Sequence, residues 1–130
     1  MILTNNGTTL RRLEITNDEL ISISKEIEDE ILSSPNCEGH NKVLTLDFSI
    51  NKYHGDEFGY VVIAEFYDIA NKRLEKLSTE VRVSNKERTK EISKERFLNA
   101  AKLIWNKVVR RNNNNGKFKS FEEADYAPWA

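Results

Sequence analysis

Within residues 42–51 apolar and polar side chains alternate from Leu44 onward, and this alternation limits the folds open to the chain more than any other feature. The apolar positions are Leu44, Leu46, Phe48 and Ile50, and the polar positions between them are Thr45, Asp47 and Ser49. A period of two predicts a β-strand with one buried and one exposed face. Two further strands are predicted, at 60–68, which is apolar on both faces and therefore central, and at 77–83. Leu74 is out of phase with the last of these, which predicts a bulge.

Two amphipathic helices are predicted on either side of these strands. The first begins at a capping box, Thr16 to Glu19, with Ile15 and Leu20 as its hydrophobic staple, and ends before Pro35. Its apolar stripe is Leu20, Ile23, Ile27 and Ile31. The second begins at a Ser93 cap, and its buried stripe is Phe97, Ala101, Ile104, Trp105 and Val108. Its opposite, solvent face is predicted to carry Arg96, Asn99, Asn106, Lys107 and Arg110.

The resulting fold class is α+β, with an antiparallel β-meander sheet and two helices on one face, in the order (ββ)-α-β-β-β-α. The first pair of strands rests on a turn at Asn5-Asn6-Gly7. The chain has 130 residues, which is enough for one core. Residues 1–111 are therefore expected to form a single domain. Residues 112–130 are expected to be a polar break and an aromatic, acidic tail that either docks on the body or binds a partner.

Composition excludes several classes of protein. No apolar run reaches the roughly 20 residues of a membrane span, and the first ten residues lack the apolar core of a signal peptide. The expected location is therefore the cytoplasm, with no membrane partner. The single cysteine, Cys37, excludes an internal disulfide framework. No cofactor is predicted.

The formal net charge of −1 conceals an uneven distribution of charge. Residues 1–71 hold five basic and thirteen acidic side chains, a net charge of −8, whereas residues 72–119 hold fifteen basic and five acidic, a net charge of +10. The last eleven residues carry −3. Such asymmetry indicates either an interaction with a charged partner or two halves that neutralise each other.

The residues able to do chemistry do not form a recognisable catalytic set. Cys37 and His40 precede the strand at 42–51 and His54 follows it, so roughly 30 Å separates them and they cannot share a zinc ion. A Cys37–His40 nucleophile would need an activating environment that no motif provides. Asp47 and Glu65 are expected on the outer face of neighbouring strands, and this pair supports a metal-dependent nuclease as a second alternative. The prediction is a protein that is not an enzyme.

Two charged surfaces remain as candidate binding sites. The first helix offers an acidic surface for a protein partner: Glu26, Glu28, Asp29 and Glu30. The segment 72–111 offers a basic surface for a polyanion: Lys86, Arg88, Lys90, Arg96, Lys107, Arg110 and Arg111. The order of elements from 17 to 111 is similar to that of double-stranded-RNA-binding domains, although the first helix here is acidic.

The favoured function is a small inhibitor or immunity-type protein that occludes a macromolecular partner, a protein rather than a nucleic acid. The acidic helix would meet a basic partner that itself handles nucleic acid. The alternative is direct binding of RNA or DNA by residues 72–111. The oligomeric state does not follow from the sequence.

Overall fold

The two predicted helices and the three predicted strands that follow the first helix are present in the computed structural model, which describes residues 15–52, 59–82, 90–112 and 117–122, and only the backbone of 90–93. In chain order these elements are α2 (Asn17–Leu32), β1 (Leu44–Lys52), β2 (Gly59–Asp68), β3 (Arg73–Arg82) and α3 (Lys90–Arg111), with short 3-10 turns at Pro35–Cys37 and His40–Lys42. The α+β class is confirmed. The expected hairpin at the N-terminus lies outside the described residues.

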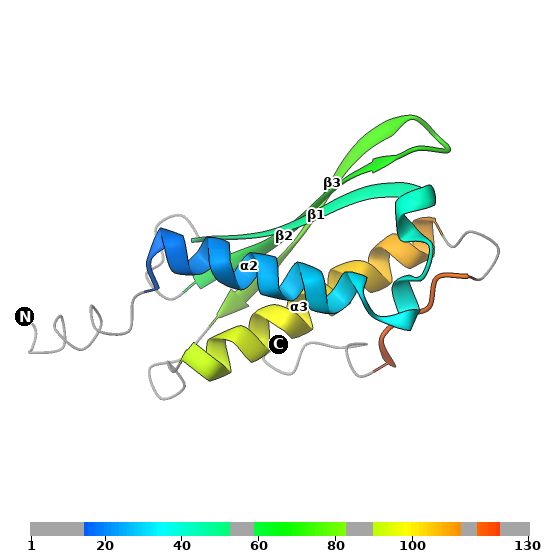
Figure 1. The fold of residues 1–130 in the computed structure, drawn as a ribbon. Coiled ribbons are helices and arrows are strands. Elements are labelled where there is room, and N and C mark those ends of the chain that lie inside the picture. Colours follow the sequence, from blue (N-terminus) through cyan, green and yellow to red (C-terminus); the bar gives the residue numbers. More distant parts are fainter. Residues whose placement is uncertain (1–14, 53–58, 83–89, 113–116, 123–130) are drawn as a thin grey trace, which may run out of the picture.

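The three strands form one antiparallel sheet in the order β1-β2-β3, so the strand that is apolar on both faces is central, as predicted. Figure 1 shows α2 and α3 on the same side of this sheet. The register of β2 and β3 runs without interruption from the Gly59–Arg82 pair to the Asp68–Arg73 pair. The predicted bulge at Leu74 is therefore wrong. Leu74 is opposite Tyr67 and lies on the outer, uncovered face.

The first helix follows its sequence signals closely. Thr16 Oγ1 accepts a hydrogen bond from the Glu19 backbone N–H at 3.2 Å, and Glu19 Oε1 accepts one from the Thr16 backbone N–H at 3.1 Å. This is the predicted capping box. Ile15 and Leu20 are both buried, as the staple requires. The helix ends at Leu32, before Pro35 begins the next turn.

The second long helix begins earlier and is buried on more sides than predicted. It starts at Lys90, so Ser93 lies inside the helix and is not its cap. The predicted apolar stripe is buried throughout, together with Ala100 and Val109. Asn106, predicted on the solvent face, is only 2% exposed. The helix therefore has a second buried side.

The segment 117–122 covers that second side. Asn106 donates from Nδ2 to the Phe121 carbonyl at 3.0 Å and accepts from the Phe121 N–H at 2.7 Å. Trp105 Nε1 donates to the Lys119 carbonyl at 3.0 Å. Phe118 and Phe121 are buried. This part of the C-terminal tail is thus docked on the body of the protein.

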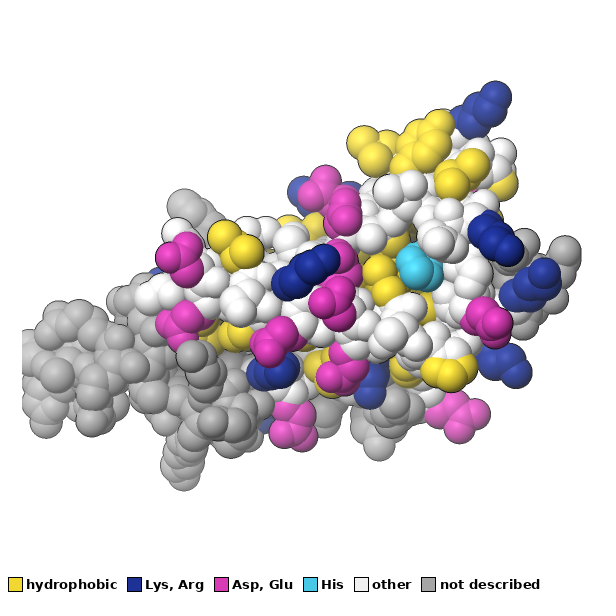
Figure 2. All heavy atoms as spheres, viewed as in Figure 1, with side chains coloured by type: hydrophobic (Ala, Val, Ile, Leu, Met, Phe, Trp, Pro, Cys, Tyr) yellow, Lys and Arg dark blue, Asp and Glu magenta, His cyan; other side chains and the backbone are white. Residues whose placement is uncertain are grey.

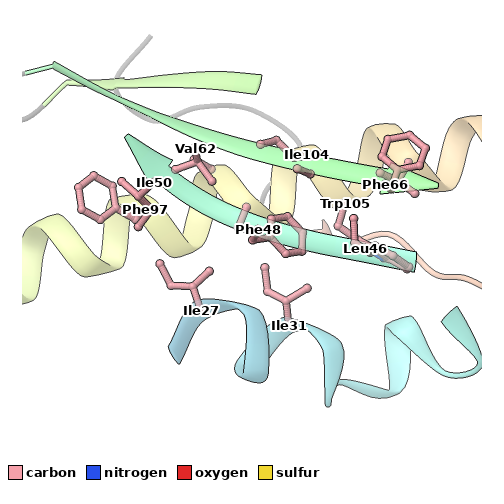
Figure 3. Packing of buried hydrophobic residues seen from close by; sticks show 14 of the residues in the cluster. Ile27, Ile31, Leu46, Phe48, Ile50, Val62, Phe66, Phe97, Ile104 and Trp105 are labelled. Carbon is pink, nitrogen blue, oxygen red and sulfur yellow. The ribbon is translucent and has the colours of Figure 1, made fainter. Parts of the chain in front are cut away.

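One hydrophobic core lies between the sheet and the two helices. Figure 3 shows Ile27 and Ile31 of α2 pointing toward Phe48 of β1, with residues of β2 and α3 completing the cluster. Burial of these side chains is the main stabilising term of the fold. Within the described part of the chain, no helix is both long enough and apolar enough to span a bilayer.

Candidate macromolecular interface

The four acidic residues predicted to contact a protein do not share one environment on α2. Glu26 reaches α3, where its Oε2 lies 3.4 Å from Lys94 Nζ. Asp29 is exposed and forms an ion pair with Lys25 at 3.7 Å on the same helix. Glu30 is exposed, and no ion pair joins it to a described residue. Glu28 alone among the four is half-buried.

The Glu28 side chain is hydrogen-bonded to the edge strand of the sheet. Its Oε2 accepts a hydrogen bond from the Phe48 backbone N–H at 3.0 Å. One helical turn earlier, Ser24 Oγ accepts from the Ile50 backbone N–H at 2.9 Å. Both N–H groups belong to β1, the edge strand, and point away from β2. Side chains of α2 thus satisfy backbone donors that a free edge would present to another strand.

The remaining acids of α2 form one negative surface. The helix carries six acidic side chains and one lysine, a net charge of −5. Figure 2 shows acidic side chains gathered over this face of the molecule, with few Lys or Arg among them. We call the exposed set the acidic surface, and its members are Asp18, Glu26, Asp29 and Glu30.

The basic candidates are only partly brought together. Lys86 and Arg88 lie outside the described residues, and Lys90 is the first residue of α3, with its side chain outside the description. Arg96 is half-buried, whereas Lys107 and Arg110 are exposed. At helical spacing these last three share one flank of α3. They form the flank that we call the basic stripe.

Arg111 is turned away from that stripe toward the sheet. Its Nη1 lies 2.7 Å from Glu75 Oε1, a carboxylate that also pairs with Arg73 at 3.4 Å. Glu75 belongs to the basic part of the sequence, so this contact does not neutralise the acidic part. The Lys94–Glu26 pair does join the two parts. Glu30 and Asp18, the other members of the acidic surface besides Asp29, nevertheless remain exposed.

Asp47 and Glu65 are direct cross-strand partners on the outer face, as the alternation predicted. Lys76 is opposite Glu65 on its other side, so a row of three charges crosses the sheet. Opposite charges in a row offset the repulsion of the two carboxylates. In the described part of the chain, no three His, Cys, Asp or Glu side chains lie close enough to hold one metal ion. Among the described residues, no third such side chain therefore joins the pair.

Cys37 and His40 lie together at the turn between α2 and β1 but do not form a nucleophile pair. The Cys37 side chain is fully buried, and this burial raises the pKa of the thiol from 9.0 to about 12. His40 Nδ1 lies 3.2 Å from the Cys37 backbone oxygen. An open hollow of about 430 Å³ lies over this turn, lined by residues 32–35 and 37–41. His54 lies outside the described residues.

Sequence reasoning missed the apolar part of the uncovered sheet face. Tyr67 and its cross-strand partner Leu74 are 40% and 76% exposed, and Ile69 follows at 42%. Figure 2 shows hydrophobic side chains gathered at this end of the β2–β3 hairpin. The signal was the phase of Leu74, which marks an apolar residue on the outer face rather than a bulge.

Comparison with known proteins gives no relative from which a function could be transferred. No family model, no curated protein and no solved structure matches this chain.

Proposed function

We propose that this protein is a non-enzymatic binding protein that occludes a basic surface of another protein through the acidic surface of α2. The single observation that supports this proposal most is the placement of Asp18, Asp29 and Glu30. These carboxylates are exposed on a helix that is capped at Thr16 and packed along its whole apolar stripe. A rigid, single-sign surface favours rapid capture of an oppositely charged partner.

The partner that fits this surface is a protein rich in Lys and Arg at its own working face. Proteins that bind nucleic acid have such faces, because they neutralise phosphates with cations. An acidic helix laid on that face would exclude the nucleic acid by competing for the same cations. Inhibition by occlusion requires no catalytic group in this chain.

The proposal is tested by photo-crosslinking in an extract of the cells that carry the protein. A photoreactive residue at position 29 on α2 is expected to capture one stoichiometric protein, and the captured protein should lose its nucleic-acid binding when the chain is added. The double variant Glu26→Lys/Glu30→Lys should abolish capture. Glu38→Lys, the same charge change at an exposed site outside α2, should leave it intact.

Folding of the double variant is checked by circular dichroism, because Glu26 also pairs with Lys94. Capture that survives the double reversal in a folded chain, or that is equally strong from a photoreactive residue at position 107 on α3, would disprove the acidic surface as the contact.

Direct nucleic-acid binding is the second candidate function, and the exposed basic stripe on α3 supports it. No ion pair joins Lys107 or Arg110 to the described residues, so both could contact phosphates. The order of elements makes duplex RNA the first probe. A gel shift at low salt, lost with Lys107→Glu/Arg110→Glu and weakened steeply by added salt, would establish this function. No shift with duplex RNA or DNA at low salt would exclude it.

A further inference from the structure

The two edge strands of the sheet, β1 and β3, differ in the hydrogen bonds that their outward backbone groups make to described residues. At β1, Glu28 and Ser24 of α2 accept the outward N–H groups of Phe48 and Ile50. At β3, the other edge, no hydrogen bond of this kind comes from a described residue. Natural sheets protect their edges against pairing with other chains, and among the described residues such hydrogen-bond acceptors cover one edge.

The contacts at β1 also establish which residues of β3 face outward. In an antiparallel sheet, backbone groups alternate between the two neighbours of a strand. The backbone N–H groups of Phe48 and Ile50 point away from β2. The backbone groups of their partners Ala64 and Val62 therefore point away from β1 and toward β3. The residues of β3 that bond to β2 are therefore the odd-numbered ones. The even-numbered residues present their N–H and C=O groups to the outer edge: Leu74, Lys76, Ser78, Glu80 and Arg82.

These five outward residues are all exposed. The strand has ten residues, contains no proline and keeps an unbroken register with β2. Its outer edge is thus long and uninterrupted enough to accept another strand. Lys76 and Glu80 lie on either side of Ser78, and no ion pair joins either one to a described residue.

We propose that β3 pairs antiparallel with β3 of a second copy of this chain, with the two-fold axis at Ser78, to make a continuous six-stranded sheet. This register places Lys76 opposite Glu80 of the second copy, and by symmetry Glu80 opposite Lys76 of that copy. Shifting the axis to residue 76 or residue 80 would place like charges opposite each other. An axis at residue 77 would place Lys76 opposite Ser78, and an axis at residue 79 would place it opposite Arg82, a like charge. An axis at residue 81 would pair Glu80 with Arg82 but would leave most of β3, Lys76 included, outside the pairing. Charge complementarity therefore selects a second copy in one register.

The row of charges across the outer face supports the same register. Asp47, Glu65 and Lys76 already lie side by side on three strands. Glu80 of the second copy would be the next member, so Lys76 would lie between two carboxylates. The helices of both copies would stay on one side of the sheet, and α2 would remain at the far edge. The pairing is therefore independent of the proposed function.

The experiment is sedimentation of the full chain over a dilution series. The wild-type chain is expected to move from one chain mass to two as its concentration rises. Lys76→Glu and Glu80→Lys should each raise the dimer Kd at least about tenfold, because each places two like-charge pairs at the interface. An equimolar mixture of the two variants should regain the wild-type Kd, since every facing pair is again of opposite charge.

A backbone variant tests the edge itself. Ser78→Pro removes an outward N–H that β2 does not use, so it should abolish the dimer and leave the fold intact, whereas Ser78→Ala should retain both. Amide exchange at Ser78 should slow as chain concentration rises.

A wild-type chain that stays monomeric at millimolar concentration would overturn the proposal. Protection of Ser78 in that monomer would assign the edge to a segment of the same chain. A dimer that is insensitive to all three disruptive variants, or a mixture that does not recover, would equally overturn this register.

Discussion

The Glu28 carboxylate accepts a hydrogen bond from the backbone N–H of Phe48 at 3.0 Å, twenty residues further along the chain. The sequence predicted Glu28 as part of a charged outer face, but its side chain joins α2 to β1 by a hydrogen bond. Its side chain is 18% exposed, against 67% for its neighbour Asp29. Glu28 is thus removed from the surface that a partner would meet.

Glu28→Ala is expected to destabilise the fold by about 1–3 kcal/mol, because it leaves the Phe48 N–H without its acceptor. Glu28→Gln should cost less, since an amide oxygen can still accept the bond. The measurement is urea unfolding followed by circular dichroism. Asp29→Ala is the matched control and should stay within about 0.5 kcal/mol of wild type. Equal losses in the two alanine variants would show that the Phe48 bond contributes nothing.

Asn106→Ala is expected to cost about 2–4 kcal/mol, because both hydrogen-bonding groups of the Phe121 backbone lose their partner in a buried place. In a Trp129→Phe background, the emission of Trp105 should also shift to the red as segment 117–122 detaches. Urea unfolding and fluorescence measure the two effects. Lys107→Ala, an exposed neighbour, is the control. Loss of stability without any change in emission would mean that the segment stays docked without Asn106.

Local signals predicted the parts of the fold that depend on neighbouring residues in the chain. The capping box at Thr16 and the proline at 35 determine the ends of α2 because both act on the backbone of the helix itself. The alternation from Leu44 to Ile50 identified the buried face of β1 because the period of a strand is a local property. These features needed no knowledge of what packs against them.

The parts that the sequence did not reveal depend on contacts between distant segments. A helical period identifies one buried face, so it could not show that residues 117–122 cover a second side of α3 and bury Asn106. Charge alone could not distinguish Glu28, which bonds to β1, from Asp29, which faces solvent. The uneven charge did persist as a surface feature of α2, although Lys94 and Glu26 join the two parts.

The Cys37 thiol is expected to resist alkylation in the native protein at pH 8 and to react readily in urea. It is fully buried, and its pKa is raised from 9.0 to about 12, so the reactive thiolate is absent. Above pH 9 the unfolded chain loses this proton and the native chain keeps it, so the free energy of unfolding falls as pH rises toward 12. Below about pH 8 the thiol is protonated in both states and has no such effect.

The pH dependence is isolated by comparison with Cys37→Ala, because lysine and tyrosine side chains titrate in the same range. Urea unfolding at pH 8 and at pH 10.5 should show a larger loss of stability in wild type than in the variant. Equal losses would contradict the raised pKa.

Asp47→Asn is expected to stabilise the fold by about 0.2–1 kcal/mol at low salt, because it removes a like charge directly opposite Glu65. The gain should shrink in about 1 M salt, where charges on an exposed sheet face are screened. Thermal unfolding measures both, with Glu38→Gln as an exposed acidic control. A metal ion held by the two carboxylates would reverse this result. Mg²⁺ or Mn²⁺ would then raise the melting temperature of wild type, and Asp47→Asn would abolish the rise. We expect no shift with either ion, since the row that crosses the sheet places the ammonium of Lys76, and no metal ion, opposite Glu65.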